Sequence, residues 1–460
     1  MRDYARETLV GIAIASLLAL FAMGVLAAAR PLATPAPLRL DAAPGAGLSR
    51  DGDALLLAGG AAPATAATLH FTLPAPDANG TRWVLWLDRD PVDALWLERA
   101  GWRSARRDFY RPAADEGALP SGFVFPLPAD WHGDVRLVLH ARGHVHAALH
   151  PRLLPEAVAS RVAYRRIALA SAVYAGLCVI ALLSLALYSA AREHAFLALA
   201  GCAGLALLLV AASNGHLYAV PVLRLFAAWR GAGLWALGLL FCASTLQLLL
   251  RYADLRAGSL SATRWFDLAS ILLAALAALC LLDLPALAGW LQSTVTIACL
   301  GASAATLVVL VDAAQRRVPM ACPLLLLGLL ACLAALARAA LSHGMLPDTL
   351  WARSGYQLGL LVTAAVLMIG LISRIGEYRD QRDRDHLARL DSERRMGRES
   401  ARAELTLALQ THLRALPAAD IEWTAFRLLL EHLLPHVPVQ AAAAVAYGYH
   451  GHDLLLVEPR

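Results

Sequence analysis

The sequence of 460 residues contains no lysine, and only 16% of its residues are charged. All 40 basic residues are arginine, and they exceed the 35 acidic residues by 40 − 35 = 5. Apolar residues make up 59%, whereas an ordinary soluble domain has roughly 45–50% apolar and about 25% charged residues. This balance excludes a soluble globular enzyme and a disordered chain. Because the arginines are spread along the chain, the sequence predicts a membrane protein without a nucleic-acid partner.

Cysteine is scarce in the sequence as well. None of the seven cysteines lies between residues 30 and 166, so that segment has no disulfide framework, and no C-x-x-C pair occurs. The sequence also lacks H-E-x-x-H and comparable catalytic strings of membrane enzymes. We therefore expect no cofactor, and we interpret the cysteines as small packing residues.

Eight apolar runs are long enough to cross a bilayer, which takes about 20 residues. The first run covers residues 9–29 and follows a short segment with two arginines, so residues 1–29 are either a cleaved signal peptide or a retained anchor helix. The other seven predict a transmembrane bundle over residues 167–373. We place its spans at residues 167–190, 195–212, 233–250, 266–282, 290–311, 322–341 and 357–373.

Arginine is distributed unevenly over the short loops of this bundle. If residues 30–166 are exported, the inner loops hold six arginines and the outer loops hold three. Cytoplasmic loops are enriched in basic residues, so the count places the C-terminus in the cytoplasm. Arg338 is the one ionisable residue clearly inside a span, and we expect it to snorkel to the outer surface. The apolar midplane is more typical of a conduit for conformational change than of a pore.

The segment between the first run and the bundle has the pattern of a β-protein. Residues 30–53 are rich in proline, alanine and glycine and predict a tether. In residues 54–166, short apolar runs alternate with turn residues, which predicts an all-β sandwich or jelly roll. The pairs at residues 79–80 and 142–143 are typical hairpin turns. Strands are expected at residues 67–73, 82–87, 93–98, 122–127, 134–140 and 144–149.

Tryptophan and arginine are concentrated in this β-protein segment, and our candidate ligand-binding residues are Trp86, Trp102, Arg103 and Arg106. Tryptophan faces stack on sugar rings, and an arginine fork can hold a carboxylate or a phosphate. We therefore expect a carbohydrate or a small anion as the ligand. Core packing is the alternative for each tryptophan. Because Trp83 and Trp86 point to opposite sides of one strand, at least one of them faces the core.

Four histidines follow toward the end of this segment. His144 and His146 share a strand face, as a zinc or copper pair would, but no cysteine or paired carboxylate accompanies them. We interpret them as surface histidines, with pH sensing as an alternative. No metal ligand and no catalytic residue is assigned.

The C-terminal part begins with a charged helix at residues 374–416. Its first 31 residues hold nine arginines and eight acidic residues, and three of the acids lie four residues before an arginine, which supports a helix. The helix is either solvated on all sides or a weak coiled coil between two protomers, and we expect a homodimer. Residues 420–460 predict a helix from residue 421 and strands at 441–447 and 454–457. We expect this α+β piece to be incomplete, because two strands do not form a stable sheet.

Several stretches resemble bacterial seven-transmembrane receptors with diverse intracellular signalling modules, the 7TM-DISM family. Residues 82–98 (RWVLWLDRDPVDALWLE) and 134–151 are similar to the family's type 2 extracellular domain, itself like a carbohydrate-binding jelly roll. In the bundle the resemblance is carried by residues 214–218 (NGHLY), 248–257 (LLLRYADLRA) and 356–374 (YQLGLLVTAAVLMIGLISR). Residues 421–460 resemble the opening helix and hairpin of a GAF-type domain.

The resemblance implies a receptor in the bacterial inner membrane, with residues 30–166 in the periplasm. Such a receptor senses a periplasmic ligand and passes a conformational change to a cytoplasmic output module or partner protein. The sequence has no GG(D/E)EF and no kinase H-box, so we expect no enzyme activity within these residues. A transporter or membrane-embedded enzyme is the first alternative. A truncated receptor that acts only by pairing with partners is the second.

Overall fold

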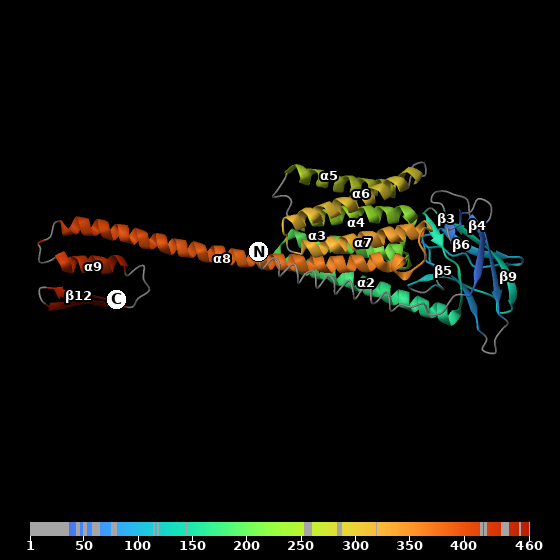
Figure 1. Ribbon diagram of the computed structural model, residues 1–460, viewed down its shortest axis with the longest axis horizontal. Coiled ribbons are helices and arrows are strands. Elements are labelled where there is room, and N and C mark those ends of the chain that lie inside the picture. The colour runs from blue at the N-terminus through green and yellow to red at the C-terminus, as the bar shows by residue number, and fades with distance from the viewer. Residues whose placement is uncertain are drawn as a thin grey trace. The chain divides into compact units, whose positions relative to one another are not determined.

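The computed structural model divides into two compact units, residues 1–373 and 374–460. Among the described residues, the first unit contains a β-rich region and seven long helices (Figure 1). The predicted signal peptide or anchor, residues 1–29, lies outside the described residues. The structure describes residues 36–42, 47–48, 53–57, 65–74, 81–113, 116, 119–143, 145–252, 260–282, 288–318, 320–414, 417, 421–433, 441–449 and 452–459.

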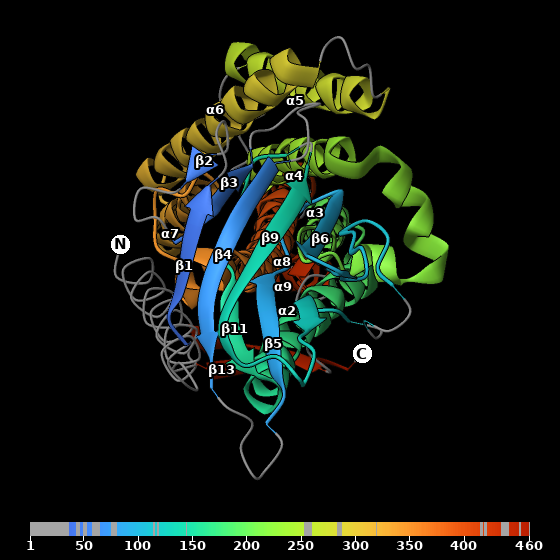
Figure 2. The same cartoon turned by 90° about the vertical axis from the view of Figure 1, so that its right-hand side faces the viewer.

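The β-rich region, here called the β-region, consists of strands β1 to β11. Its largest described sheet has five antiparallel strands in the order β1-β4-β9-β6-β7 (Figure 2). The pairing of β4 with β9 is the longest and runs from Thr65 opposite Ala141 to Leu73 opposite Gly133. These strands are β1 (Leu38–Ala42), β4 (Thr65–Leu73), β9 (Gly133–Arg142), β6 (Ala94–Arg99) and β7 (Trp102–Arg103).

Two three-stranded sheets complete the described β-region, with the orders β11-β5-β8 and β10-β3-β2. Leucine and phenylalanine side chains from all three sheets meet in one buried cluster, to which Leu69, Leu85 and Phe123 belong. Burial of apolar surface is the main force that holds such layers together. The strands are β11 (Arg152–Pro155), β5 (Trp83–Asp88), β8 (Gly122–Pro126), β10 (Ala147–Leu149), β3 (Leu55–Leu57) and β2 (Gly47–Leu48).

Each predicted strand overlaps a strand of the structure, but the connections differ from those expected. Strands β1 and β2 lie inside the range predicted as a tether. Leu38 and Leu40 of β1 pack on the core, and β2 pairs with β3, in spite of the surrounding proline and glycine. Residues 79–80 lie outside the described residues. The strands on either side of them, β4 and β5, belong to different sheets, as do β9 and β10 on either side of residues 142–143. Strand β4 is not hydrogen-bonded to β5, and β9 is not hydrogen-bonded to β10, so neither pair of described strands forms the expected hairpin.

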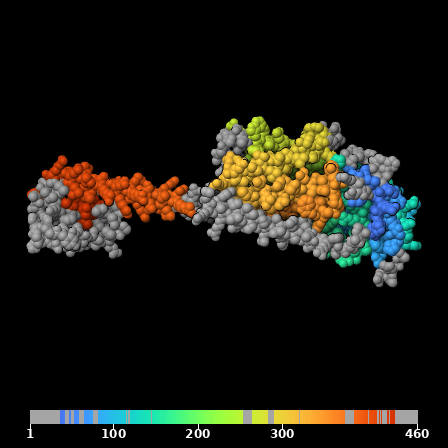
Figure 3. Space-filling model, in the orientation of Figure 1, coloured from blue at the N-terminus to red at the C-terminus, as the bar shows by residue number. Residues whose placement is uncertain are grey.

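Seven described helices are long and apolar enough to cross a membrane, and they match the seven predicted spans. Large apolar side chains such as Ile297, Leu329 and Leu336 are exposed on the bundle, where lipid would cover them. Figure 3 shows the flank formed by α6 and α7. The helices are α2 (Glu156–Ala191), α3 (His194–Ser213), α4 (Arg230–Tyr252), α5 (Leu260–Leu281), α6 (Ala288–Gln315), α7 (Ala321–Ser342) and α8 (Leu350–Leu413).

The first turns of α2 belong to the β-region. The helix begins directly after β11, 11 residues before the predicted boundary at residue 167, and Val158 and Ala159 pack on Val84 and Trp86 of β5. The main core of the β-region also includes Leu217 and Tyr218 from the loop after α3. The β-region is therefore packed directly on one end of the bundle, which we call the β-end.

The second unit contains the C-terminal part of α8, followed by α9 (Ile421–Leu433). Strands β12 (Ala441–Tyr449) and β13 (His452–Pro459) pair as an antiparallel hairpin. The predicted helix and both predicted strands are confirmed. The predicted span 357–373 and the charged helix 374–416 belong to one helix, α8, which continues through Gly370 and Gly376 on either side of their boundary; no proline interrupts it there.

Candidate functional site

Three consecutive charged residues are buried where β5 leaves its sheet. Asp88, Arg89 and Asp90 are 0%, 5% and 2% exposed. Strand β5 is covered on both faces, by the main core at Leu85 and Leu87 and by α2 at the positions between them. The chain that follows it therefore starts inside the molecule. Charges so deeply buried need partners of opposite sign.

Arg353, in the first turn of α8, is the central partner of these carboxylates. Its Nη2 lies 2.9 Å from Asp88 Oδ2, and its Nη1 donates to both oxygens of Asp90 at 3.2 Å. Its Nε donates to Asp348 Oδ1 at 3.1 Å. A planar guanidinium with five N–H groups can bind several carboxylates at once, which an ammonium cannot do in fixed geometry. One side chain of the bundle thus binds two carboxylates of the β-region.

Three further arginines complete this group. Arg338 Nη2 donates to Asp90 Oδ1 at 2.6 Å, Arg166 binds Asp88, and Arg152 binds Asp348. The expectation that Arg338 snorkels to the surface is wrong, because a carboxylate of the β-region lies directly over the end of its helix. We call these seven side chains the junction cluster: Asp88, Asp90, Asp348, Arg152, Arg166, Arg338 and Arg353.

The three carboxylates of the junction cluster differ in acidity. Burial acts to raise the pKa of Asp88, but Arg166 and Arg353 outweigh it and hold that pKa well below its ordinary value. Burial opposes Arg353 and Arg338 in the same way at Asp90, whose pKa is also lowered. At Asp348, burial and the neighbouring Asp88 carboxylate raise the pKa. Asp88 and Asp90 are therefore the permanent anions of the cluster.

Arg89 points into the β-region instead of the junction cluster. Its Nη1 lies 2.6 Å from Glu116 Oε2, and its guanidinium lies over the rings of Phe109 and Phe123 at 5.6 and 5.1 Å. Gly215 makes room for it: the residue has φ +77°, and a Cβ there would lie 2.6 Å from Arg89 Nε. Only glycine satisfies both conditions.

A chain of neutral hydrogen bonds runs beside the charged groups. Gln357 Nε2 donates to Asn214 Oδ1 at 2.8 Å, and Asn214 Nδ2 donates to the Tyr174 hydroxyl at 2.8 Å. The Tyr174 hydroxyl lies 2.9 Å from His216 Nδ1, and His216 Nε2 lies 3.1 Å from the carbonyl oxygen of Pro120. Because a carbonyl only accepts, Nε2 carries the hydrogen and Nδ1 accepts from Tyr174. The chain links α8, α3 and α2 to the β-region.

We expect the stability of the protein to decrease when the pH is lowered, partly because of His216. Burial lowers the pKa of His216 to about 4, against about 6.5 in an unfolded chain. The folded state then binds fewer protons than the unfolded state, so this stability is present above pH 6.5 and is lost as the pH falls toward 4, by about 1.4 kcal/mol per pH unit. The measurement is the pH dependence of the melting temperature. The melting temperature of His216→Gln should depend less steeply on pH between pH 4 and 6.5. Equal slopes for the variant and the wild type would contradict the role assigned to His216.

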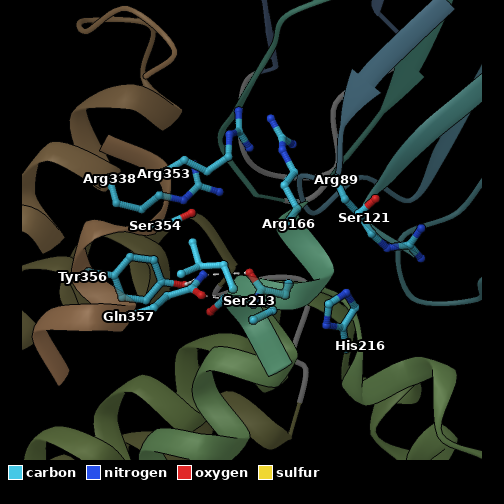
Figure 4. Close-up of a pocket in the computed structure, with 13 residues that line it drawn as sticks. Arg89, Ser121, Arg166, Ser213, His216, Arg338, Arg353, Ser354, Tyr356 and Gln357 are labelled. Atoms are coloured by element: carbon cyan, nitrogen blue, oxygen red, sulfur yellow. Dashed lines mark hydrogen bonds between the residues drawn. The ribbon is translucent and has the colours of Figure 1, made fainter. Parts of the chain in front are cut away.

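A cavity of about 50 Å³ lies between the β-region and the β-end of the bundle. In Figure 4, Arg338 and Arg353 lie on one side of it, Arg89, Ser121 and His216 lie on the other, and Arg166 stands between them. Ser213 and Gln357 also line it. Among the lining residues that the structure describes, Leu169 and Ala170 are aliphatic. The arrangement combines guanidinium and neutral donors around a small, partly open space.

The four predicted ligand-binding residues are not part of this cavity, and the structure does not bring them together. Trp86 is 1% exposed and packs against α2, with its Nε1 3.2 Å from Asp88 Oδ1. Trp102 packs edge-to-face on Trp131 at 5.0 Å. Arg103 lies exposed beside it in β7, 5.2 Å from the Trp96 ring centroid, and Arg106 is exposed in the following loop. As expected, Trp83 and Trp86 lie on opposite faces of β5, the first against the main core and the second against α2.

The histidines predicted to lie on the surface have varied positions. His140 stacks on Trp96 at 5.0 Å, His146 lies 4.8 Å from His343, and His150 is buried. His144 lies outside the described residues. Among the residues that the structure describes, no group of three or more histidine, cysteine, aspartate or glutamate side chains has the arrangement of a metal site.

Sequence reasoning did not select the residues of the junction cluster. Asp88, Asp90 and Arg353 stand in stretches that look like ordinary loops, and Arg353 counted only as one of the outer-loop arginines. The available signal was the string Asp88-Arg89-Asp90 directly after an apolar strand, together with the isolated arginine in α7. Comparison with models of protein families, with curated proteins and with solved structures gives no match.

Proposed function

We propose that the chain is a bacterial transmembrane receptor of the 7TM-DISM type. In this proposal the β-region senses a ligand in the periplasm, and the bundle passes a conformational change to α8 and on to a cytoplasmic output module or partner protein. The observation that carries the proposal is the position of Arg353. It binds Asp88 and Asp90 of the β-region and lies in the first turn of the helix that continues to Leu413. Any movement of that carboxylate pair acts directly on α8.

The finer architecture belongs to the same proposal. The sheets that enclose one apolar core support a jelly roll or sandwich as the fold of the sensor. Helix α9 and the β12–β13 hairpin support the opening of a GAF-like domain. The arginine count of the loops supports a periplasmic β-region, a cytoplasmic C-terminus and the inner membrane as location. A homodimer formed along the exposed part of α8 would give the receptor two coupled output helices.

Substitution of Asp90 by asparagine tests the receptor. It removes the charge that Arg353 and Arg338 share, so α8 loses a constraint in its first turn. We expect amide hydrogen exchange in residues 374–413 to become about five-fold faster, the effect of an allosteric coupling of about 1 kcal/mol. The measurement is hydrogen–deuterium exchange with mass spectrometry on the full chain in lipid nanodiscs.

Asp130→Asn is the matched control, because Asp130 is exposed in the loop before β9. It should leave the exchange of α8 unchanged. If Asp90→Asn changes exchange only in the β-region, the receptor proposal fails. Accumulation of a labelled solute in proteoliposomes would support the transporter instead, and crosslinking that gives only monomers would contradict the homodimer.

A further inference from the structure

The wall of the cavity between the β-region and the β-end of the bundle is strongly basic. Among its described lining residues are four arginines and no aspartate or glutamate. Carboxylates of the junction cluster bind Arg166, Arg338 and Arg353, and Glu116 binds Arg89. A molecule in the cavity therefore meets guanidinium, hydroxyl and amide groups, which suit an acceptor-rich anion.

The junction cluster itself has an excess of positive charge. Its seven side chains carry four positive and three negative charges when Asp348 is ionised, which leaves an excess of one positive charge on arginine side chains that are 10–31% exposed. A buried charge without a counter-charge is costly. One monovalent anion would balance the cluster.

Two arginines have donors to offer such an anion. Arg166 and Arg338 each donate to one carboxylate among the described residues, whereas a guanidinium has five N–H groups. Their side chains are 19% and 23% exposed, and both line the cavity. They can therefore bind a second acceptor without releasing Asp88 or Asp90.

The size of the cavity limits the anion. One buried water molecule needs about 10–15 Å³ of cavity volume. A cavity of about 50 Å³ therefore holds roughly three to five non-hydrogen atoms. This is the size of acetate. A planar carboxylate also matches the fork of an arginine.

We propose that this cavity binds a small monovalent carboxylate, and that the anion links the β-region to the β-end of the bundle. This inference rests on the proposed receptor function and names the class of its ligand. Arg166 and Arg338 bind the carboxylate oxygens, and Ala170 and Leu169 contact its apolar end. Because the walls come from both parts, the anion stabilises their docked arrangement.

Acetate is the probe that tests the site. Its binding to the full chain in nanodiscs is measured by isothermal titration calorimetry and by the melting temperature, at constant ionic strength with chloride as the reference anion and phosphate as a second probe. We expect acetate to bind and to raise the melting temperature above the chloride value. Arg166→Gln should weaken binding about ten- to hundred-fold, the effect of losing a hydrogen bond to a charged group.

Ala170→Leu keeps the result interpretable if Arg166→Gln does not fold. It fills the cavity from the apolar side of α2 and removes no ion pair, so it should keep the melting temperature in chloride and abolish the effect of acetate. Arg136→Gln, an exposed change on β9, should bind acetate like the wild type. The inference is overturned if acetate acts like chloride, if phosphate binds instead, or if Ala170→Leu leaves acetate binding intact.

Amide hydrogen exchange in residues 374–413 distinguishes the receptor proposal from the anion-site proposal. If acetate binds and this segment does not respond to acetate or to Asp90→Asn, the anion site stands and the receptor function fails. If Asp90→Asn changes the segment and acetate does not bind, the receptor stands and the anion site fails.

Discussion

Replacement of Arg353 by glutamine is expected to lower the free energy of unfolding by about 3–5 kcal/mol, the usual effect of removing one partner from a buried ion pair. The substitution leaves Asp88, Asp90 and Asp348 without the guanidinium that contacts all three. Because burial opposes their ionisation, they must take up protons or move toward water. Thermal unfolding of the full chain in detergent, together with limited proteolysis of the β-region, measures the effect.

Two comparisons make the result specific. Arg353→Lys keeps the positive charge, but a compact ammonium group cannot bind three carboxylates in fixed geometry. The stability of this variant should therefore lie between that of Arg353→Gln and that of the wild type. Arg136→Gln removes an exposed arginine of the β-region and should change little. If Arg353→Gln melts at the wild-type temperature, the junction cluster does not hold the β-region to the bundle.

Substitution of Trp86 by alanine should have an effect of similar size, about 3–5 kcal/mol of lost stability. The indole of Trp86, which projects from β5, is fully buried against β8 and the first turns of α2. Its removal leaves a large void and also removes the Nε1–H that lies 3.2 Å from Asp88 Oδ1. The midpoint of thermal unfolding reports the loss. A ligand platform would behave differently, because its removal would abolish binding and spare stability.

Gly122 provides the matched test of this packing. A Cβ at Gly122 would lie 2.4 Å from Trp86 Cζ2, so Gly122→Ala alone should destabilise by about 1–3 kcal/mol through overpacking. In combination with Trp86→Phe the clash disappears, and the double variant should be more stable than the sum of the two changes predicts. Simple additivity would show that the two residues are not in contact.

The sequence by itself determined the elements whose signal is local. Seven apolar runs of about 20 residues predicted seven spans, all of which are present as helices. Short apolar runs between turn residues predicted six strands of the β-region, namely β4, β5, β6, β8, β9 and β10, and acid–arginine pairs at a spacing of four predicted the charged part of α8. Each of these signals is contained within its own segment, since hydropathy and periodicity depend on neighbouring residues alone. They could be read without any knowledge of what the segment contacts.

Tertiary structure alone decided the site. Asp88 and Arg353 are far apart in the chain and meet only because the β-region packs on the β-end of the bundle. The same packing makes Arg338 an ion-pair partner instead of a snorkelling residue, and it makes Trp86 a core residue instead of an exposed platform. It also assigns consecutive strands to different sheets, so the expected hairpins do not form. The physical reason is that pairing and burial of charge depend on which surfaces come together, and no local pattern specifies that.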